Sequence, residues 1–378
     1  MRDAAAQRRR LRITGGQSKR FHPASADLAQ GPCLDMRPYA GIVSYEPSEL
    51  VITARAGTPL AEVEALLARH GQCLAFEPPR FAMDAAAGAA AGAVNGTANG
   101  TGGTAGSTVG GMVSSGLSGP ARASVGALRD FVLGAEILNG RGELLRFGGQ
   151  VMKNVAGYDV SRLVAGSWGR LAAITEVSLK VLPLAPAEAT LRFDCDQARA
   201  LALLHAWGGQ PLPLNASCWL PEDGQGRLYV RLRGAQAAVQ AACRSMGGAL
   251  LPTESAAQDW QACRDQRLPW FTQRAPGLAL WRLSLPQTAP ALPPSLGVPL
   301  IEWHGGLRWL QAPPEHTEAI TAQARQAGGN ATIFIAASHG QTPGNGIFDL
   351  QDPVLQGLQQ RLSQAFDPQG VFSAGQGA

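Results

Sequence analysis

Residues 153–183 read KNVAGYDVSRLVAGSWGRLAAITEVSLKVLP, and this stretch decides the prediction of the fold. Its first part intersperses glycines among polar and apolar residues, a texture typical of loops in which the backbone approaches another group closely. Its last part, from Leu171 to Leu182, is rich in β-forming residues and ends at Pro183, which predicts a strand. The stretch is one of four glycine-containing segments that we consider together.

The other three segments lie near the two ends and in the first half of the chain. Residues 13–19 read ITGGQSK and predict a short strand that runs into a polar turn, whose consecutive N–H groups can bind an anion. Residues 108–120 read TVGGMVSSGLSGP, and residues 366–375 read FDPQGVFSAG. None matches a GxGxxG loop that opens a helix, or a Walker loop. Neither a Rossmann site nor a P-loop site is therefore expected.

In this order, the segments resemble the PCMH-type FAD-binding fold of the vanillyl-alcohol-oxidase superfamily. Within it, the chain is most similar to the FAD-binding subunits of glycolate oxidase, through residues 153–183, 46–60 (EPSELVITARAGTPL) and 128–149 (LRDFVLGAEILNGRGELLRFGG). The similarity continues through LPWF, LWRLSLP, EWHGGLRWL and FDPQGVF, so it covers nearly the whole chain.

The length of 378 residues suits two domains. The resemblance implies an α+β fold, with a two-lobed PCMH-type FAD-binding domain over 1–186 and an α+β cap domain over 187–340. Residues 341–378 are expected to return toward the flavin domain. An Ala/Gly-rich tract at 83–108 has no periodic apolar face, which predicts a flexible loop inserted in the first domain.

Local patterns predict several elements. Thr58 as N-cap and Pro59 at the first position predict a helix, and Phe131–Leu138 with Glu143–Phe147 predict a hairpin across Asn139-Gly140. In the second half, strands are expected at 228–232, 278–285 and 332–336, and helices at 197–207, 235–246, 314–327 and 353–366.

The resemblance also implies an FAD site built from loops. The implied residues are Gly15, Gly16, Gln17, Ser18 and Lys19 at the pyrophosphate, Pro78 near the flavin edge, Gly110, Gly111, Ser114, Ser115 and Gly119 along the groove, and Ile174 and Thr175 beside the isoalloxazine or ribityl portion. His22 matches no flavinylation motif, so FAD is expected to bind non-covalently.

Lysine usage points to the same segments. Only three of the 32 basic residues are lysines, namely Lys19, Lys153 and Lys180, and all three lie in the segments quoted above. Retained lysines suggest a need for a compact point charge, at the pyrophosphate for Lys19 and near the flavin or substrate for Lys153. Chance in so small a sample is the alternative.

Oxidation of a 2-hydroxy acid needs a cation for the carboxylate, a base for the hydroxyl proton and a hydride acceptor. Arg282 and Arg308 are candidates for the carboxylate, because a guanidinium can bind it through two hydrogen bonds; structural arginines are the alternative. His304 and His339 are the options for the base. Residues 338–342 read SHGQT and lack the His/Gly/Asp/Asn motif of related dehydrogenases, so no catalytic base is assigned.

Composition excludes several other classes. Hydrophobic residues make up 45% and charged residues 16%, as in globular proteins, and no apolar run approaches the length of a transmembrane helix. The net charge of +4 comes from residues 1–20, and the rest of the chain is slightly acidic, so nucleic acid is not an expected partner. The six cysteines form no CxxC pair, which argues against a metal or iron–sulfur site.

The resemblance implies an FAD-dependent 2-hydroxy-acid oxidoreductase subunit that oxidises glycolate to glyoxylate. Its partners would be a sister flavoprotein and an iron–sulfur subunit, and its location the cytoplasm or, through the complex, the inner membrane face. Two alternatives stay open. One is a non-catalytic assembly subunit of that complex, and the other is a free-standing FAD-dependent dehydrogenase for an acid such as D-lactate.

Overall fold

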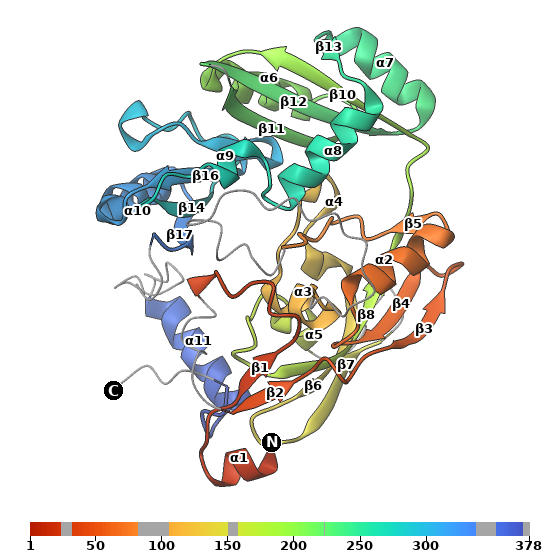
Figure 1. The fold of residues 1–378 in the computed structure, drawn as a ribbon, viewed down its shortest axis with the longest axis vertical. Helices are drawn as coiled ribbons and strands as arrows, with labels where there is room; N and C mark the ends of the chain where they lie inside the picture. Colours follow the sequence, from red (N-terminus) through yellow and green to blue (C-terminus); the bar gives the residue numbers. More distant parts are fainter. Residues whose placement is uncertain (24–31, 82–105, 150–157, 223, 338–352, 373–378) are drawn as a thin grey trace. The chain divides into compact units, whose positions relative to one another are not determined.

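The structure is a computed structural model that describes residues 1–23, 32–81, 106–149, 158–222, 224–337 and 353–372 (Figure 1). Lys153, His339, the SHGQT stretch and most of the Ala/Gly tract lie outside these residues.

The chain divides into two compact units, whose bounds differ from those of the predicted domains. Unit 1 holds the described residues of Met1–Leu117, Ala127–Pro183 and Leu350–Ala378, and unit 2 holds those of Ser118–Gly126 and Leu184–Asp349. A single domain was predicted over 1–186, whereas Ser118–Gly126 belongs to unit 2.

A five-stranded antiparallel sheet forms the centre of unit 1. Its order is β3 (Ile42–Glu46), β4 (Val51–Arg55), β8 (Ala173–Lys180), β6 (Val132–Leu138) and β7 (Leu144–Gly148). Strand β8 is the one predicted before Pro183, and it pairs with strands on both sides. Its apolar residues are buried because they face packed elements of the unit; Ala173, Val177 and Leu179 are at most 1% exposed.

The predicted hairpin is present as β6 and β7, with a loop longer than two residues. The Asn139 side chain accepts hydrogen bonds from the backbone N–H groups of Arg141 and Glu143, and so closes the turn. The C-terminal FDPQGVF sequence packs on this turn. The Gly140 N–H donates to the Phe366 carbonyl at 2.9 Å, and a Cβ on Gly140 would overlap Asp367.

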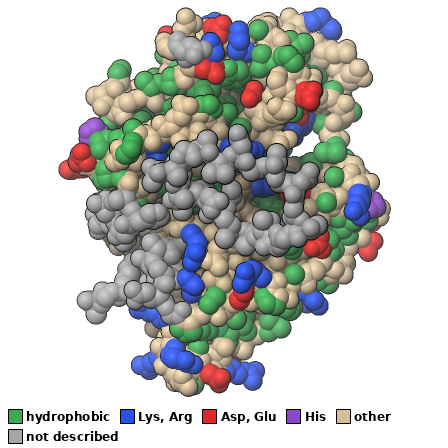
Figure 2. Space-filling model, viewed as in Figure 1, with side chains coloured by type: hydrophobic (Ala, Val, Ile, Leu, Met, Phe, Trp, Pro, Cys, Tyr) green, Lys and Arg blue, Asp and Glu red, His purple; other side chains and the backbone are tan. Residues whose placement is uncertain are grey.

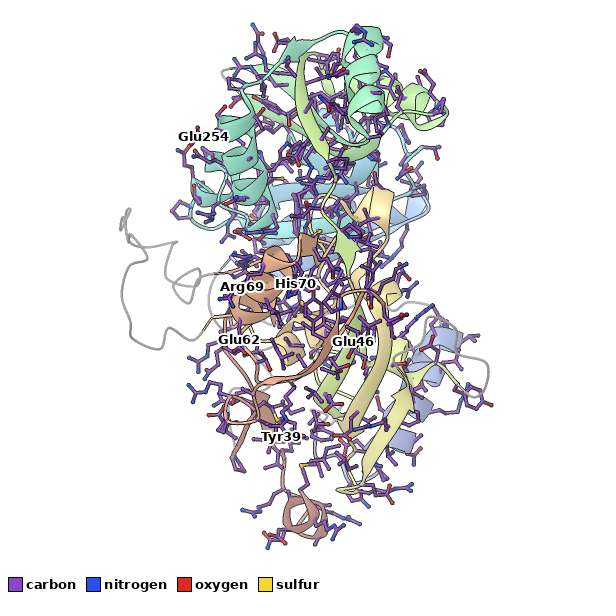
Figure 3. The ribbon with its side chains drawn as sticks, turned by 90° about the vertical axis from the view of Figure 1, so that its right-hand side faces the viewer. Tyr39, Glu46, Glu62, Arg69, His70 and Glu254 are labelled. Atoms are coloured by element: carbon purple, nitrogen blue, oxygen red, sulfur yellow. The ribbon has the colours of Figure 1, made fainter. Side chains whose placement is uncertain are left out.

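Short elements surround this sheet in unit 1. They are α1 (Arg2–Ala6), β1 (Arg12–Thr14) parallel to β2 (Cys33–Asp35), α2 (Leu60–Arg69), β5 (Gln72–Cys73) paired with β9 (Leu182–Pro183), α3 (Val109–Ser115), the 3-10 turn η3 (Leu128–Phe131), α5 (Val160–Val164) and α11 (Pro353–Phe366). The predicted helix at Pro59 is α2, with an acidic residue in its first turn and a basic one in its last, as the helix dipole favours (Figure 3).

One detail of that helix differs from the prediction. Pro59 itself is the N-cap of α2, and Thr58 does not cap the helix. The Thr58 hydroxyl instead donates to the Gly41 carbonyl and accepts from the Gly41 N–H, so it joins the helix start to a neighbouring loop. A tertiary contact therefore takes the hydroxyl that the local pattern assigned to capping.

Unit 2 is built on an eight-stranded antiparallel sheet. Its order is β13 (Ala249–Leu250), β10 (Ala187–Asp194), β12 (Gln225–Gly234), β11 (Leu214–Glu222), β15 (Leu300–Glu302), β16 (Leu307–Ala312), β14 (Ala279–Ser284) and β17 (Asn330–Ile335). The helices are α4 (Arg122–Val125), α6 (Gln197–Gly208), α7 (Gln236–Met246), α8 (Thr253–Arg264), α9 (Pro269–Thr272) and α10 (Thr317–Gln326), with 3-10 turns η4 (Pro294–Leu296), η5 (Trp303–Gly305) and η6 (Pro314–His316).

The strands and helices predicted in the second half are confirmed, with ends shifted by at most a few residues. The sheet carries two apolar cores. One contains Leu204, Trp219 and Val230, and the other contains Trp281, Leu310 and Ile320. Helix α8 was not predicted, since its 12 residues are mostly polar and only Ala256, Trp260 and Cys263 are buried.

No helix within the described residues is long and apolar enough to cross a bilayer. On the face shown in Figure 2, outside the grey segments, Lys and Arg side chains are dispersed among other types and do not gather into one basic patch.

Candidate functional site

A pocket in unit 1 brings together residues of three glycine-containing segments, 13–19, 108–120 and 153–183. Its volume is about 150 Å³. It is lined by Arg12, Ile13, Thr14, Gly15, Gly16, Gln17, Ser18, Lys19, Arg20, Thr108, Gly111, Ser114, Ser115 and Trp168. Three of these residues are cationic and none is acidic. The lining therefore suits an anionic group.

The turn after β1 is packed so closely that only glycine fits in it. A Cβ on Gly16 would lie 1.6 Å from the Gly106 carbonyl oxygen, and one on Gly15 would lie 2.6 Å from the Thr108 hydroxyl. The hydroxyls of Ser18 and Ser107 also lie 3.0 Å apart in a buried hydrogen bond. These contacts hold the turn against the start of α3.

The electrostatics of the pocket centre on Lys19. Burial lowers the pKa of its ammonium group from 10.5 to about 8. The charged form of Lys19 is thus less favourable than in water, and an anion bound nearby would favour it again. Lys19 is suited to bind an anion that enters the pocket.

Trp168 is the residue of the segment 153–183 that lines the pocket. Its backbone N–H donates to the Ser114 carbonyl at 2.8 Å, and its φ of 55° is unusual for a residue with a side chain. Its ring stacks on the His22 imidazole, with centroids 4.0 Å apart and planes inclined by 15°. The backbone strain and the stacking together fix the indole in the pocket wall.

The turn η5 in unit 2 is a second strained place. Trp303 and His304 are consecutive and both have left-handed backbone angles, with φ of 54° and 56°. Each such angle costs on the order of 1–3 kcal/mol, and strain of this kind is often found at functional sites. The Trp303 Nε1–H donates to the Gly119 carbonyl at 2.9 Å, which ties η5 to the segment before α4.

His304 is placed between two serine hydroxyls. Its Nδ1 lies 3.0 Å from Ser217 Oγ and its Nε2 lies 3.1 Å from Ser124 Oγ. The His304 backbone N–H also donates to Ser217 Oγ at 2.9 Å. Ser217 is fully buried, so its own hydrogen is directed to Nδ1, which leaves the imidazole proton on Nε2. Burial lowers the pKa of His304 to about 4, so the ring is neutral near pH 7.

The two candidate arginines have different surroundings. Arg308 is fully buried, and its guanidinium donates to the carbonyls of Ala289, Pro290 and Gly305. It donates to backbone carbonyls in a buried place, which favours the alternative of a structural arginine over a carboxylate-binding one. Arg282 is half-buried and lies over the Trp303 ring, 5.2 Å from its centroid.

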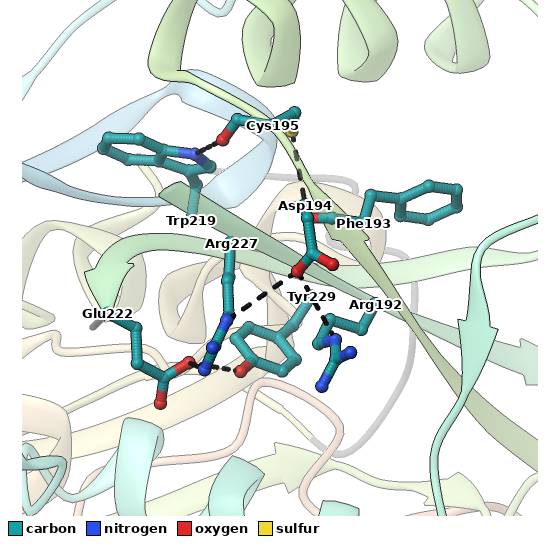
Figure 4. Close-up of polar contacts among 8 residues, drawn as sticks. All are labelled: Arg192, Phe193, Asp194, Cys195, Trp219, Glu222, Arg227 and Tyr229. Atoms are coloured by element: carbon teal, nitrogen blue, oxygen red, sulfur yellow. Dashed lines mark hydrogen bonds and ion pairs between the residues drawn. The ribbon is translucent and has the colours of Figure 1, made fainter. Parts of the chain in front are cut away.

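The charged residues at the β11–β12 hairpin that Figure 4 draws are all paired with one another. Glu222 accepts hydrogen bonds from the Tyr229 hydroxyl at 2.6 Å and from Arg227 at 2.8 Å. Arg227 and Arg192 also face Asp194, at 3.7 and 3.6 Å. Each carboxylate faces arginine, so we interpret the cluster as a structural network that closes the hairpin.

Comparison with known proteins shows the family to which the chain belongs. A model of the FAD binding domain family matches residues 1–106. The glycolate oxidase subunit GlcE of Escherichia coli K12 is 42% identical over 367 residues, which is 97% of this chain and 91% of GlcE. The chain belongs to the GlcE family of glycolate oxidase subunits.

Other relatives match shorter parts of the chain, and a solved structure matches nearly all of it. The glycolate oxidase subunit GlcD of Bacillus subtilis is 41% identical over 78 residues, or 21% of this chain and 16% of GlcD. A D-lactate dehydrogenase of Archaeoglobus fulgidus is 35% identical over 128 residues, or 34% of this chain and 24% of that protein. A structure of alkyldihydroxyacetonephosphate synthase superposes with a TM-score of 0.63 at 15% identity, covering 98% of this chain and 73% of that one, which shows the shared fold.

FAD is the cofactor of this protein, and the unit 1 pocket fits the diphosphate of FAD. The fit rests on the cationic lining without carboxylates and on the glycines where no side chain has room. Eight of the predicted cofactor residues line this one pocket: Gly15, Gly16, Gln17, Ser18, Lys19, Gly111, Ser114 and Ser115.

The other predicted cofactor residues lie elsewhere in the described structure. Gly110 packs against Ala56, and Thr175 on β8 donates its hydroxyl hydrogen to Glu136. Ile174 is on β8, Pro78 follows β5, and neither lines the pocket. Gly119 belongs to unit 2.

Six lining residues were not predicted, namely Arg12, Ile13, Thr14, Arg20, Thr108 and Trp168. All of them except Trp168 lie in, begin or directly adjoin the segments 13–19 and 108–120. Trp168 stands inside a quoted segment, but nothing in its sequence context shows that its ring reaches His22.

Proposed function

We propose that this chain is the FAD-binding subunit of a complex that oxidises glycolate to glyoxylate and passes the electrons to partner subunits. The observation that carries the proposal is the coincidence of a cationic, glycine-walled pocket with 42% identity to GlcE over almost the whole chain. The names of the relatives GlcE and GlcD, both subunits of glycolate oxidase, support an assembly of several chains.

When bound, FAD supplies a two-electron acceptor for the hydride that leaves the hydroxyl-bearing carbon. The residues of this chain bind and orient it. The backbone of the Gly15–Lys19 turn and the hydroxyls of Ser114 and Ser115 would hold the diphosphate, with Lys19 and Arg12 balancing its charge. No described residue is assigned a covalent bond to the cofactor, and non-covalent binding is part of the proposal.

The acceptor of the electrons is a further part of the proposal. Within the described residues, the six cysteines are free thiols and no group of three or more His, Cys, Asp or Glu side chains could hold a metal ion. We therefore propose that an iron–sulfur subunit, together with a sister flavoprotein, receives the electrons. Attachment of this complex to the inner membrane face is part of the same proposal.

A second candidate function, a non-catalytic assembly subunit, is favoured by the state of His304. His304, one of the two options for the base, is neutral and carries its proton on Nε2, so it donates toward Ser124. A subunit of this kind would bind FAD for stability and leave glycolate oxidation to its sister.

The test is to purify the chain alone and with its two partner subunits, and to record the flavin spectrum before and after anaerobic addition of glycolate. We expect about one FAD per chain, and bleaching by glycolate in the isolated chain. Colourless protein would contradict the proposal. Bound FAD that glycolate never bleaches in this chain, with turnover in the complex, would favour the assembly role, and turnover of D-lactate without partners would favour a free-standing dehydrogenase.

A further inference from the structure

The segment Ser118–Gly126 and the turn η5, both in unit 2, meet in a cluster that the pocket in unit 1 does not include. Trp303 donates to the Gly119 carbonyl, and His304 lies 3.1 Å from the Ser124 hydroxyl. Two arginines complete the cluster: the Arg122 guanidinium lies 4.4 Å from the centroid of the Trp303 ring, and that of Arg282 lies 5.2 Å from it.

Two cations thus share one indole. Both attractions to the ring are favourable, but the two guanidiniums repel each other. Burial and then the charge of Arg122 lower the pKa of Arg282 to about 10, while the charge of Glu302 acts in the opposite direction. An anion bound near the two arginines would relieve their repulsion.

The nearby carboxylate of Glu302 is engaged elsewhere. Its Oε2 accepts from Trp309 Nε1 at 2.6 Å, and its Oε1 accepts from the Cys263 thiol at 3.3 Å. In the part of the chain that the structure describes, no carboxylate or carbonyl accepts a hydrogen bond from the Arg282 guanidinium. Its donors are available to a ligand.

The other groups of the cluster donate as well. The buried Ser217 hydroxyl fixes the His304 proton on Nε2, which donates to Ser124, and Ser124 is exposed with its own hydrogen free to turn outward. A site that presents two guanidiniums and an exposed hydroxyl selects for an oxyanion.

We propose that Arg282, Arg122 and the His304–Ser124 pair form an anion subsite in unit 2 that binds the carboxylate of a small 2-hydroxy acid. The choice of a carboxylate rests on the proposed function. In this subsite Arg282 binds the two carboxylate oxygens, Arg122 adds positive charge, and His304 positions the Ser124 hydroxyl. His304 is here a positioning residue and not a base.

The test measures binding of oxalate, a carboxylate that the flavin cannot oxidise by hydride transfer, to the purified full chain with FAD by isothermal titration calorimetry. We expect saturable binding to the wild type. Arg282→Gln and Arg122→Gln should each weaken it about tenfold or more, and Ser124→Ala by a smaller factor. Arg244→Gln, which removes the same charge from an exposed position on α7, is the matched control and should bind as the wild type does.

Arg282→Lys is a second variant, for the case that the glutamine variant does not fold. It keeps the positive charge but loses the planar guanidinium that can bind a carboxylate through two hydrogen bonds. It should bind oxalate more weakly than the wild type, with an unchanged FAD content. Absence of saturable binding to the wild type overturns the subsite. So does affinity within twofold of the wild type in both Arg282→Gln and Arg122→Gln. Phosphate that binds as tightly as oxalate, with the same losses in the variants, overturns the assignment to a carboxylate.

The subsite and the proposed function fail in different ways. If the assembled complex oxidises glycolate and Arg282→Gln leaves its KM unchanged, the subsite is wrong and the function stands. If Arg282→Gln abolishes oxalate binding but the wild-type complex never oxidises glycolate, the function is wrong and the subsite stands.

Discussion

The indole of Trp168 lies face to face with the imidazole of His22, with ring centroids 4.0 Å apart. The two residues are far apart in the sequence. Trp168 lines the unit 1 pocket, whereas His22 is not among the lining residues and is buried, with 7% of its surface exposed. The pair makes the pocket wall rigid where the segment 153–183 meets the chain that follows the turn at 15–19.

Trp168→Ala should release FAD, because it removes both the pocket wall and a stacked pair worth about 0.5–1.5 kcal/mol beyond its buried area. Trp168→Phe keeps a ring on His22 and should retain most of the cofactor. The ratio of flavin to protein absorbance after gel filtration measures the effect. Equal FAD content in the alanine variant and the wild type would show that the indole does not support the cofactor.

Lys19→Gln should weaken FAD binding by about tenfold near pH 7, where the lysine of the wild type is charged. Because burial lowers the Lys19 pKa to about 8, a growing share of the side chain is neutral above pH 8 in the cofactor-free protein. A bound diphosphate raises this pKa, so FAD binding should take up protons above pH 8 and weaken as the pH rises.

Calorimetric titration with FAD in buffers of different ionisation enthalpy measures that proton uptake. Lys19→Gln should remove it. In the cofactor-free protein the lowered pKa has the opposite sign for stability: charged Lys19 destabilises the fold below pH 8, and this penalty disappears as the pH rises toward 10.5. Proton uptake that persists in the glutamine variant would assign it to another group.

Gly16→Ala should destabilise the turn after β1 by about 1–3 kcal/mol and abolish FAD retention, since the new Cβ would lie 1.6 Å from the Gly106 carbonyl oxygen. Gly149→Ala is the matched control, because no heavy atom lies within 4 Å of the Cβ position there. Thermal unfolding and flavin content measure both variants. An alanine at position 16 that leaves the flavin content intact would show that the turn does not need its close approach.

Arg308→Met should destabilise unit 2 by about 3 kcal/mol or more, because the carbonyls of Ala289, Pro290 and Gly305 lose their donors in a buried place. Arg244→Met, at an exposed position, should leave stability within about 0.5 kcal/mol. Chemical denaturation followed by tryptophan fluorescence measures the difference. A stable Arg308→Met variant that fails to oxidise glycolate would instead restore Arg308 as a substrate-binding residue.

Tyr229→Phe should cost about 1 kcal/mol through loss of its hydrogen bond to Glu222, and should change how stability depends on pH. Burial raises the pKa of Glu222, but the bonds from Tyr229 and Arg227 lower it more, so its net shift is downward. The resulting stabilisation is present above pH 4.5, the ordinary pKa of a glutamate, and is lost as the pH falls through the lowered pKa.

Unfolding in urea at pH 7 and at pH 3 tests this sign. The wild type should lose more stability than Tyr229→Phe between the two values. An equal loss in both proteins would mean that the hydroxyl does not set the Glu222 pKa.

Much of the fold followed from local patterns. The strand before Pro183, the β6–β7 hairpin and helices α6, α7 and α11 are where apolar periodicity, turn residues and a proline placed them. Patterns of this kind predict elements because each depends on neighbours a few residues away. They failed at Thr58, where a long-range bond to Gly41 takes the hydroxyl, and at α8, whose face is too polar to show a period.

The order of the glycine segments in the sequence carried the resemblance that predicts FAD as the cofactor and these loops as its site. That Gly16 has no room for a side chain was decided by the tertiary structure, because the atom in the way is the carbonyl oxygen of the distant Gly106. The tertiary structure decided which side chains meet: Trp168 and His22, Ser18 and Ser107, and, in unit 2, Arg282 and Arg122 at the Trp303 ring. It also distinguished Arg308 from Arg282, which were equal candidates for the substrate carboxylate in the sequence. Burial and partners distinguish them, and both depend on packing between residues far apart in the chain.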